Sequence, residues 1–212
     1  MRPPESWSSA RVTLAIAVAT AAVWAVLALL RLTEGAAPIG GFVPARFGAD
    51  DALPGVPAWL TPLTATLLHA NVVHLAFNLL ILAFCGRPTE AVLGPAGLAI
   101  LYLVGAYAAA AAQYLADPAS AVPMVGASGA VSGVLGAYAI LFGRNRVRVA
   151  NSKLALWLNA LWLMAAWIGL QLIIGFGISA DGVDIAIAAH IGGFLVGVAL
   201  ANPLLLLRYR KA

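Results

Sequence analysis

Charged side chains are scarce in this 212-residue chain, because only 9% of its residues are Asp, Glu, Lys or Arg, whereas 63% are hydrophobic. Soluble domains carry about 25% charged residues. So few charges cannot cover the surface of a water-soluble domain of this size. The composition therefore predicts a polytopic membrane protein whose solvent is the lipid bilayer.

Cysteine is nearly absent as well, since Cys85 is the only one. A single cysteine excludes an intrachain disulfide and the CxxC patterns of redox and metal sites. The three histidines, His69, His74 and His190, form no HExxH-type pair, so we predict no bound metal. The net charge of +4 is small and dispersed, which argues against binding to nucleic acid.

The chain contains several long apolar stretches. Each approaches the roughly 20 residues that a helix needs to cross about 30 Å of hydrocarbon. The first is longer than the apolar core of a signal peptide, about 7–15 residues, so we interpret it as a retained span. The sequence predicts an all-α bundle of six transmembrane helices, with a short N-terminal segment at 1–11 and a basic tail at 208–212. The predicted spans, which make up one domain at 12–207, are at about 12–32, 67–86, 91–116, 125–143, 154–176 and 185–207.

Basic residues show how these spans are oriented. Ten of the twelve Lys and Arg residues lie in the N-terminal segment, a turn at 87–90, the loop at 144–153 and the tail. The opposite loops hold six of the eight acidic residues. By the positive-inside rule both termini are cytoplasmic. The long loop at 33–60 contains four prolines and several aromatic residues, so we expect an ordered structure at the membrane interface.

Four polar residues gather near the outer face under this topology. Ser128 lies at the start of the fourth span and His190 at the start of the sixth. His74 and Asn78, in the outer half of the second span, are four residues apart and therefore share a helix face. Ionisable groups at this depth usually face a protein interior or a wet cavity. We expect Ser128 and His190 to form an activated nucleophile, with His74 and Asn78 as hydrogen-bond donors to an oxyanion.

Small residues on the fourth and sixth spans predict that these two helices approach closely. Glycine and alanine four residues apart let membrane helices come into backbone contact. That contact would bring the hydroxyl of Ser128 within reach of the His190 ring. The predicted packing glycines are Gly126, Gly129, Gly133, Gly193 and Gly197.

Other residues have less specific interpretations. Asp181 or Asp184 could complete a triad with His190, but both lie in a loop of no fixed register, so we favour a dyad. His69 is five residues before His74, about 140° around a helix. We therefore expect it to face elsewhere or to lie ahead of the helix. Ser132 is interpreted as bonding the carbonyl four residues back.

Taken together, the motifs resemble those of the rhomboid intramembrane serine proteases. The matching pieces are Gly126-Ala127-Ser128-Gly129 with Gly133, Ala189-His190 with Gly193 and Gly197, His74-Leu75-Ala76-Phe77-Asn78, Phe42–Phe47 and Glu90–Gly94. They occur in the family's order and cover most of the chain. A Trp-Arg pair that some relatives carry in the first loop is missing between 33 and 60.

This resemblance implies a function and a mechanism. Ser128 is the expected nucleophile and His190 the general base and then acid, while Asn78, His74 and the backbone amide of Ser128 line an oxyanion hole. The substrates are single-pass or polytopic transmembrane proteins, cut near the extracytoplasmic face, with no metal, nucleotide or other cofactor. The fifth helix and the loop at 177–184 are associated with substrate entry. The compact six-span form favours a bacterial inner membrane.

Two other functions are compatible with the sequence. A catalytically inactive rhomboid-like protein could bind membrane helices without cutting them. A small transporter or proton channel could use the three histidines, although the polar residues end halfway across the membrane. Three tryptophans of the fifth span are expected to face lipid or the interface; they are Trp157, Trp162 and Trp167.

Overall fold

The computed structural model describes residues 10–47, 55–143, 151–178 and 186–210, and every regular element within them is helical. Short 3-10 helices and one π-helical turn connect the longer helices. The elements are α1 (Arg11–Leu29), α2 (Thr33–Gly40), η1 (Pro44–Phe47), η2 (Ala58–Leu60), α3 (Thr61–Thr64), η3 (Ala65–Leu67), α4 (Val72–Ile81), the π-helical η4 (Leu82–Gly86), α5 (Arg87–Ala116), α6 (Ser128–Phe142), α7 (Ser152–Ile178) and α8 (Ile187–Tyr209).

Four helical segments in the described ranges are long and apolar enough to cross a membrane. They are Arg11–Leu29, Val72–Ala116, Leu154–Ile173 and Ile187–Tyr209. The second measures 45 residues, about twice the roughly 20 that one crossing needs. The helix α6 is apolar too but has only 15 residues. The chain is therefore an all-helical membrane protein with several crossings.

The 45-residue segment bends at Gly94, and this bend corrects the sequence analysis, which placed a turn at 87–90. Gly94 has φ 79°, a left-handed conformation that strongly favours glycine, and Pro95 follows it. Arg208 of α8 donates from Nη1 to the carbonyl oxygen of Ala91 (2.7 Å), one of the carbonyls that the bend leaves without a helical partner. Residues 87–90 themselves are helical.

Glu90 lies just before this bend and holds the N-terminus of α1. The carboxylate accepts the backbone amides of Val12 and Thr13, both at 2.8 Å, and the Thr13 hydroxyl at 2.7 Å. No side chain of α1's own N-cap residue caps the helix, so Glu90 satisfies its free amides from a distant part of the chain. These three bonds account for a carboxylate that is only 1% exposed.

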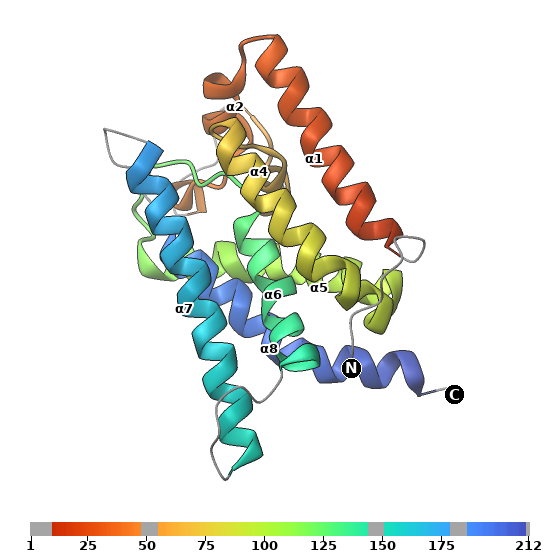
Figure 1. Ribbon diagram of the computed structural model, residues 1–212. Helices are drawn as coiled ribbons and strands as arrows, with labels where there is room; N and C mark the ends of the chain where they lie inside the picture. The colour runs from red at the N-terminus through yellow and green to blue at the C-terminus, as the bar shows by residue number, and fades with distance from the viewer. Residues whose placement is uncertain (1–9, 48–54, 144–150, 179–185, 211–212) are drawn as a thin grey trace.

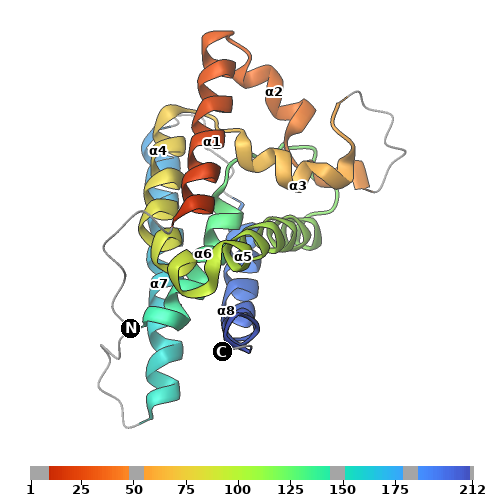
Figure 2. The same cartoon turned by 90° about the vertical axis from the view of Figure 1, so that its right-hand side faces the viewer.

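The helix α6 lies at the centre of the bundle. It packs most extensively against α8 and α5, and α7 lies on another side of it (Figures 1 and 2). Both views show α7 reaching beyond the other helices at one end. Eleven of the fifteen residues from Ser128 to Phe142 are buried. The central helix is thus enclosed by protein, and the first residue of this helix is Ser128.

Four of the five glycines predicted to pack helices lie where α6 and α8 meet, and Gly126 is the exception. A Cβ atom added to Gly193 would overlap the carbonyl oxygen of Gly129, and one added to Gly197 would overlap that of Gly133. The two backbones are thus in van der Waals contact, with no room for side chains at these positions. The small-residue pattern in the sequence predicted this contact between the fourth and sixth apolar stretches.

The described parts of the segment after α1 form short helices, namely α2, η1 and η2. Phe42 and Met124 form two backbone hydrogen bonds, at 2.9 and 2.8 Å, which join this segment to the chain just before α6. Arg46 is 5% exposed and donates from Nη2 to the carbonyl of Val56 at 2.9 Å. The α2–α3 region therefore lies against one end of the bundle (Figure 2).

Candidate active site

Ser128 and His190 meet where α6 and α8 are in backbone contact. The Oγ atom of Ser128 and the Nε2 atom of His190 are 2.8 Å apart, within hydrogen-bonding distance. Ser128 is 8% exposed and His190 is 4% exposed, so both side chains are shielded from bulk solvent. A serine hydroxyl that donates to an imidazole is the arrangement of an activated nucleophile.

The residues before Ser128 shape the start of α6. Gly126 has φ 118°, a conformation that strongly favours glycine, and α6 begins two residues later. The first amides of α6 have no partner within the helix and carry the positive end of its dipole. A Cβ atom on Gly126 would come within 2.6 Å of Cε1 of His74. Gly126, predicted to pack helices, therefore lies outside α6 and makes room for the His74 ring.

His74 and Asn78 occupy one side of α4, next to this loop. Asn71 caps α4, and its Oδ1 accepts the backbone amide of His74 at 2.8 Å. The Nδ2 group of Asn78 donates to the carbonyl of His74 at 2.9 Å, which leaves its second N–H available. His74 lines the cavity described below, whereas Asn78 is 1% exposed and does not.

His69 lies ahead of α4, which is the second of the two positions expected for it, and it lies close to the Ser128 loop. Its Nε2 atom accepts the backbone amide of Ala127 at 3.4 Å, and its ring lies 5.0 Å from that of His74 in an edge-on arrangement. The second apolar stretch becomes helical only at Val72, so the first alternative, a His69 on another face of the helix, does not apply. His69 instead lies in the connection before α4, where that spacing does not apply.

Trp167 also departs from its prediction, because it is buried at 3% exposure rather than facing lipid. The other two tryptophans of α7 agree with the prediction: Trp157 is 52% exposed and Trp162 is 71% exposed. The indole N–H of Trp167 donates to Oγ of Ser132 at 2.8 Å. Ser132 in turn donates to the carbonyl of Ser128 at 2.7 Å, which is the bond to the residue four positions back that the sequence predicted.

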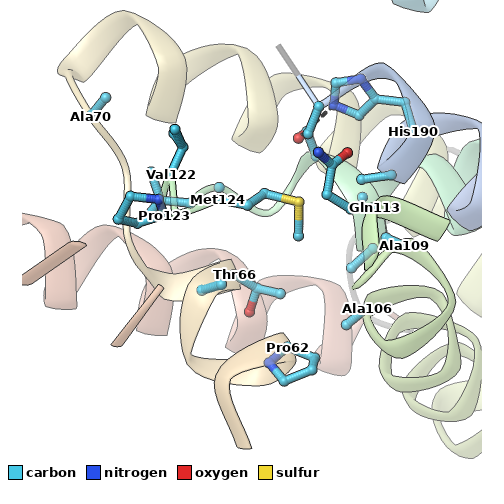
Figure 3. Close-up of a pocket in the computed structure, with 18 of the residues that line it drawn as sticks. Pro62, Thr66, Ala70, Ala106, Ala109, Gln113, Val122, Pro123, Met124 and His190 are labelled. Carbon is cyan, nitrogen blue, oxygen red and sulfur yellow. Dashed lines mark hydrogen bonds between the residues drawn. The ribbon is translucent and has the colours of Figure 1, made fainter. Parts of the chain in front are cut away.

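A cavity of about 440 Å³ opens beside Ser128 and His190. Figure 3 shows Pro62 and Thr66 on one wall and Ala106, Ala109 and Gln113 along another, with the side chain of Met124 reaching between them. Much of the lining is small and apolar. Its polar members include Gln113 of α5 and Gln171 of α7, neither of which the sequence analysis identified.

The sequence predicted no bound metal, a dyad without a third acidic residue, and a substrate-entry loop at 177–184. The described residues contain no group of three or more His, Cys, Asp or Glu side chains that could hold a metal ion. Within the same part of the chain, Nδ1 of His190 has no hydrogen-bond partner. Asp181 and Asp184, the candidates for a third triad member, lie outside the described residues, as does much of the predicted substrate-entry loop at 177–184.

Several known proteins are similar in sequence to this chain. A family profile described as "Rhomboid domain" matches residues 57–207. Rhomboid protease GluP of Bacillus subtilis is 32% identical over 166 residues, which is 74% of this chain and 29% of that protein. Rhomboid-related protein 2 of Mus musculus is 31% identical over 135 residues, 63% of this chain and 44% of that protein. The putative rhomboid protease YdcA of Bacillus subtilis is 32% identical over 104 residues, 48% of this chain and 52% of that protein. The chain thus spans about half or less of the length of these relatives.

Proposed function

The chain belongs to the rhomboid family, and on that premise we propose that it is an intramembrane serine endopeptidase that cuts transmembrane-helix substrates near the extracytoplasmic face. One observation carries the proposal: the 2.8 Å contact between Oγ of Ser128 and Nε2 of His190, beside a cavity large enough for a peptide. A membrane protein that only binds helices has no need of a serine paired with a histidine.

The proposed reaction begins with Ser128. Nε2 of His190 takes the hydroxyl proton while Oγ attacks the scissile carbonyl carbon. The negative charge that develops on the carbonyl oxygen is stabilised by the backbone amide of Ser128 at the positive end of α6, together with His74 and Asn78. Collapse of this intermediate breaks the peptide C–N bond, and His190 gives the proton to the leaving amine, which leaves an ester on Ser128.

Hydrolysis of that ester needs water, which hydrocarbon cannot supply. We infer that it enters through the cavity, whose wall includes Gln113 and Gln171. His190 takes a proton from this water, and the resulting hydroxide attacks the ester carbonyl. The proton then returns to Oγ of Ser128 as the new carboxylic acid leaves. A substrate helix must unwind locally before this sequence can start, because its amide carbonyls are otherwise hydrogen-bonded.

The proposed topology has six crossings in one domain at 12–207, with both termini in the cytoplasm. The bend at Gly94 supports it, because it divides the 45-residue segment into two lengths that each suit one crossing. With α6 as a short, enclosed crossing, the total is six. The charge distribution of the loops supports a position of Ser128 and His190 in the outer half of the membrane. For location we propose a bacterial inner membrane, with transmembrane proteins as substrates.

The oxyanion role predicts a large effect for Asn78. Asn78→Ala should lower kcat on a fluorogenic transmembrane peptide by about 10²–10³, as loss of other oxyanion donors does. Asn78→Asp, which keeps the shape and replaces the donor by an acceptor, should lower kcat at least as far. KM should change little in both variants, because the interaction forms in the transition state. Unchanged turnover in either variant would remove Asn78 from the oxyanion hole.

Labelling with a fluorophosphonate separates the protease from an inactive helix-binding relative. The reagent should modify Ser128 in the purified protein, and mass spectrometry should place the adduct on that residue. Ser120→Ala is a matched control, since Ser120 also lines the cavity but contacts neither His190 nor Ser128 in the described structure. Absence of labelling, together with an uncut transmembrane peptide, would favour the inactive binder. Proton flux into liposomes that survives Ser128→Ala would favour the channel.

A further inference from the structure

Trp167 is the tryptophan of α7 that points into the protein. It is 3% exposed, whereas Trp162, five residues earlier, is 71% exposed. A buried indole offers one donor and no acceptor, so its N–H requires a partner inside the protein. That partner is Oγ of Ser132, at 2.8 Å.

The hydrogen bonds of Ser132 have a defined direction. A serine hydroxyl has a single hydrogen, and Ser132 donates it to the carbonyl oxygen of Ser128 at 2.7 Å. A lone pair of the same oxygen accepts the indole N–H of Trp167. The two bonds therefore form a chain from α7, through Ser132, to the backbone of the nucleophilic residue. Both of its acceptors lie on α6, inside a buried region where such bonds are strong.

The same indole also contacts the histidine. The ring centroids of Trp167 and His190 are 6.2 Å apart, and the ring planes meet at 68°. This edge-on geometry is a favoured arrangement of two aromatic rings. His190 can serve Ser128 only if its ring is turned so that Nε2 faces Oγ. No described residue bonds Nδ1, and the Trp167 ring is in position to restrain the imidazole by packing.

We propose that Trp167 is a positioning residue for the dyad, an inference that rests on the proposed protease function. Its ring edge restrains the His190 imidazole with Nε2 toward Ser128, and its N–H holds Ser132 against the Ser128 carbonyl. One side chain of α7 thus supports both members of the pair without touching the substrate. A displacement of α7 that moves this side chain would loosen both at once.

Kinetics of matched tryptophan variants test the proposal. Trp167→Phe keeps a ring edge but loses the N–H, so kcat on the fluorogenic peptide should fall about threefold to tenfold, the range expected for one hydrogen bond. Trp167→Leu removes the ring as well, and kcat should fall further. KM should stay unchanged in both. Trp162→Phe, the exposed control on the same helix, should cleave at the parent rate. Parental kcat in Trp167→Leu would overturn the proposal.

A double-variant comparison isolates the hydrogen bond. In a Ser132→Ala background the indole has no acceptor, so Trp167→Phe should lower kcat no further. An aromatic ring at this position should preserve part of the activity, so Trp167→Phe should be more active than Trp167→Leu. If Trp167→Phe and Ser132→Ala instead multiply their losses, the two side chains act separately and the chain from α7 to Ser128 is wrong.

An NMR measurement distinguishes failure of this inference from failure of the proposed function. The Trp167 indole N–H should exchange with solvent deuterium far more slowly than that of Trp162, and Ser132→Ala should accelerate it. In Trp167→Leu the ring resonances of His190 should shift. These results support the positioning role even if the parent cuts no peptide, an outcome that would overturn the protease function alone. Fast indole exchange in an active parent would overturn the positioning role alone.

Discussion

Ser128→Ala and His190→Ala should each lower kcat on a transmembrane peptide by about 10⁴–10⁶-fold, and the double variant should lose no more than the worse single one. The reason is that the two side chains act as one unit through the 2.8 Å contact. Without His190, Oγ of Ser128 has no base to take its proton. Without Ser128, the histidine has no nucleophile to activate. The measurement is single-turnover cleavage of a fluorogenic transmembrane peptide by purified protein in detergent.

Controls for this experiment must show that the variants still fold. The midpoint of thermal unfolding should stay close to that of the parent, because both changes shorten side chains without adding atoms to the contact between α6 and α8. Ser120→Ala, on the cavity wall, should retain most of the activity. If either dyad variant cleaves as fast as the parent, or if their losses multiply, the two residues do not form a catalytic pair.

The contact between Ser128 and His190 could be predicted because the information is local to two short motifs. Glycines at spacing four on both stretches require close helices, and the charges of the loops set the two residues at the same depth. The bend at Gly94 could also have been predicted, because Gly94 and Pro95 stand together directly after Leu93. It was missed because charged residues at 87–90 look like a loop. The burial of Glu90 depends on its bonds to the amides of α1, a contact across 77 positions of the chain.

His69 and Trp167 show what local patterns leave out. The side on which His69 lies depends on where α4 begins, and the cap at Asn71 sets that beginning. Trp167 shares a face of α7 with Asn159 and Gln171, which stand eight residues before it and four residues after it and are both buried. These two polar residues mark the inward face of the helix, but the acceptor of the indole N–H, Oγ of Ser132, is known only from the packing of α7 against α6. His69 and Trp167 contact the motif residues through tertiary structure alone.

Gly197→Ala should destabilise the protein by about 1–3 kcal/mol or more, the cost of overpacking a tight core. The added Cβ would overlap the carbonyl oxygen of Gly133, which is backbone and cannot rotate away. The helices α6 and α8 must therefore separate locally. Activity should fall as well, because Ser128 and His190 stand on these same two helices, and their hydrogen bond depends on this separation. Thermal unfolding in detergent and the cleavage assay measure the two effects.

Gly169→Ala is the matched control, since it makes the same substitution in α7 at a position where an added Cβ meets nothing within 4 Å. Alanine favours a helix over glycine by up to about 1 kcal/mol, so this variant should be as stable as the parent or more so. An unfolding midpoint equal to the parent's in Gly197→Ala would show that the α6–α8 contact can accommodate an added methyl group. The close approach would then not be what sets the distance from Ser128 to His190. Loss of stability and activity in both variants would point instead to a general intolerance of added volume. Loss of stability and activity in Gly197→Ala alone would tie the geometry of the Ser128–His190 pair to one backbone contact.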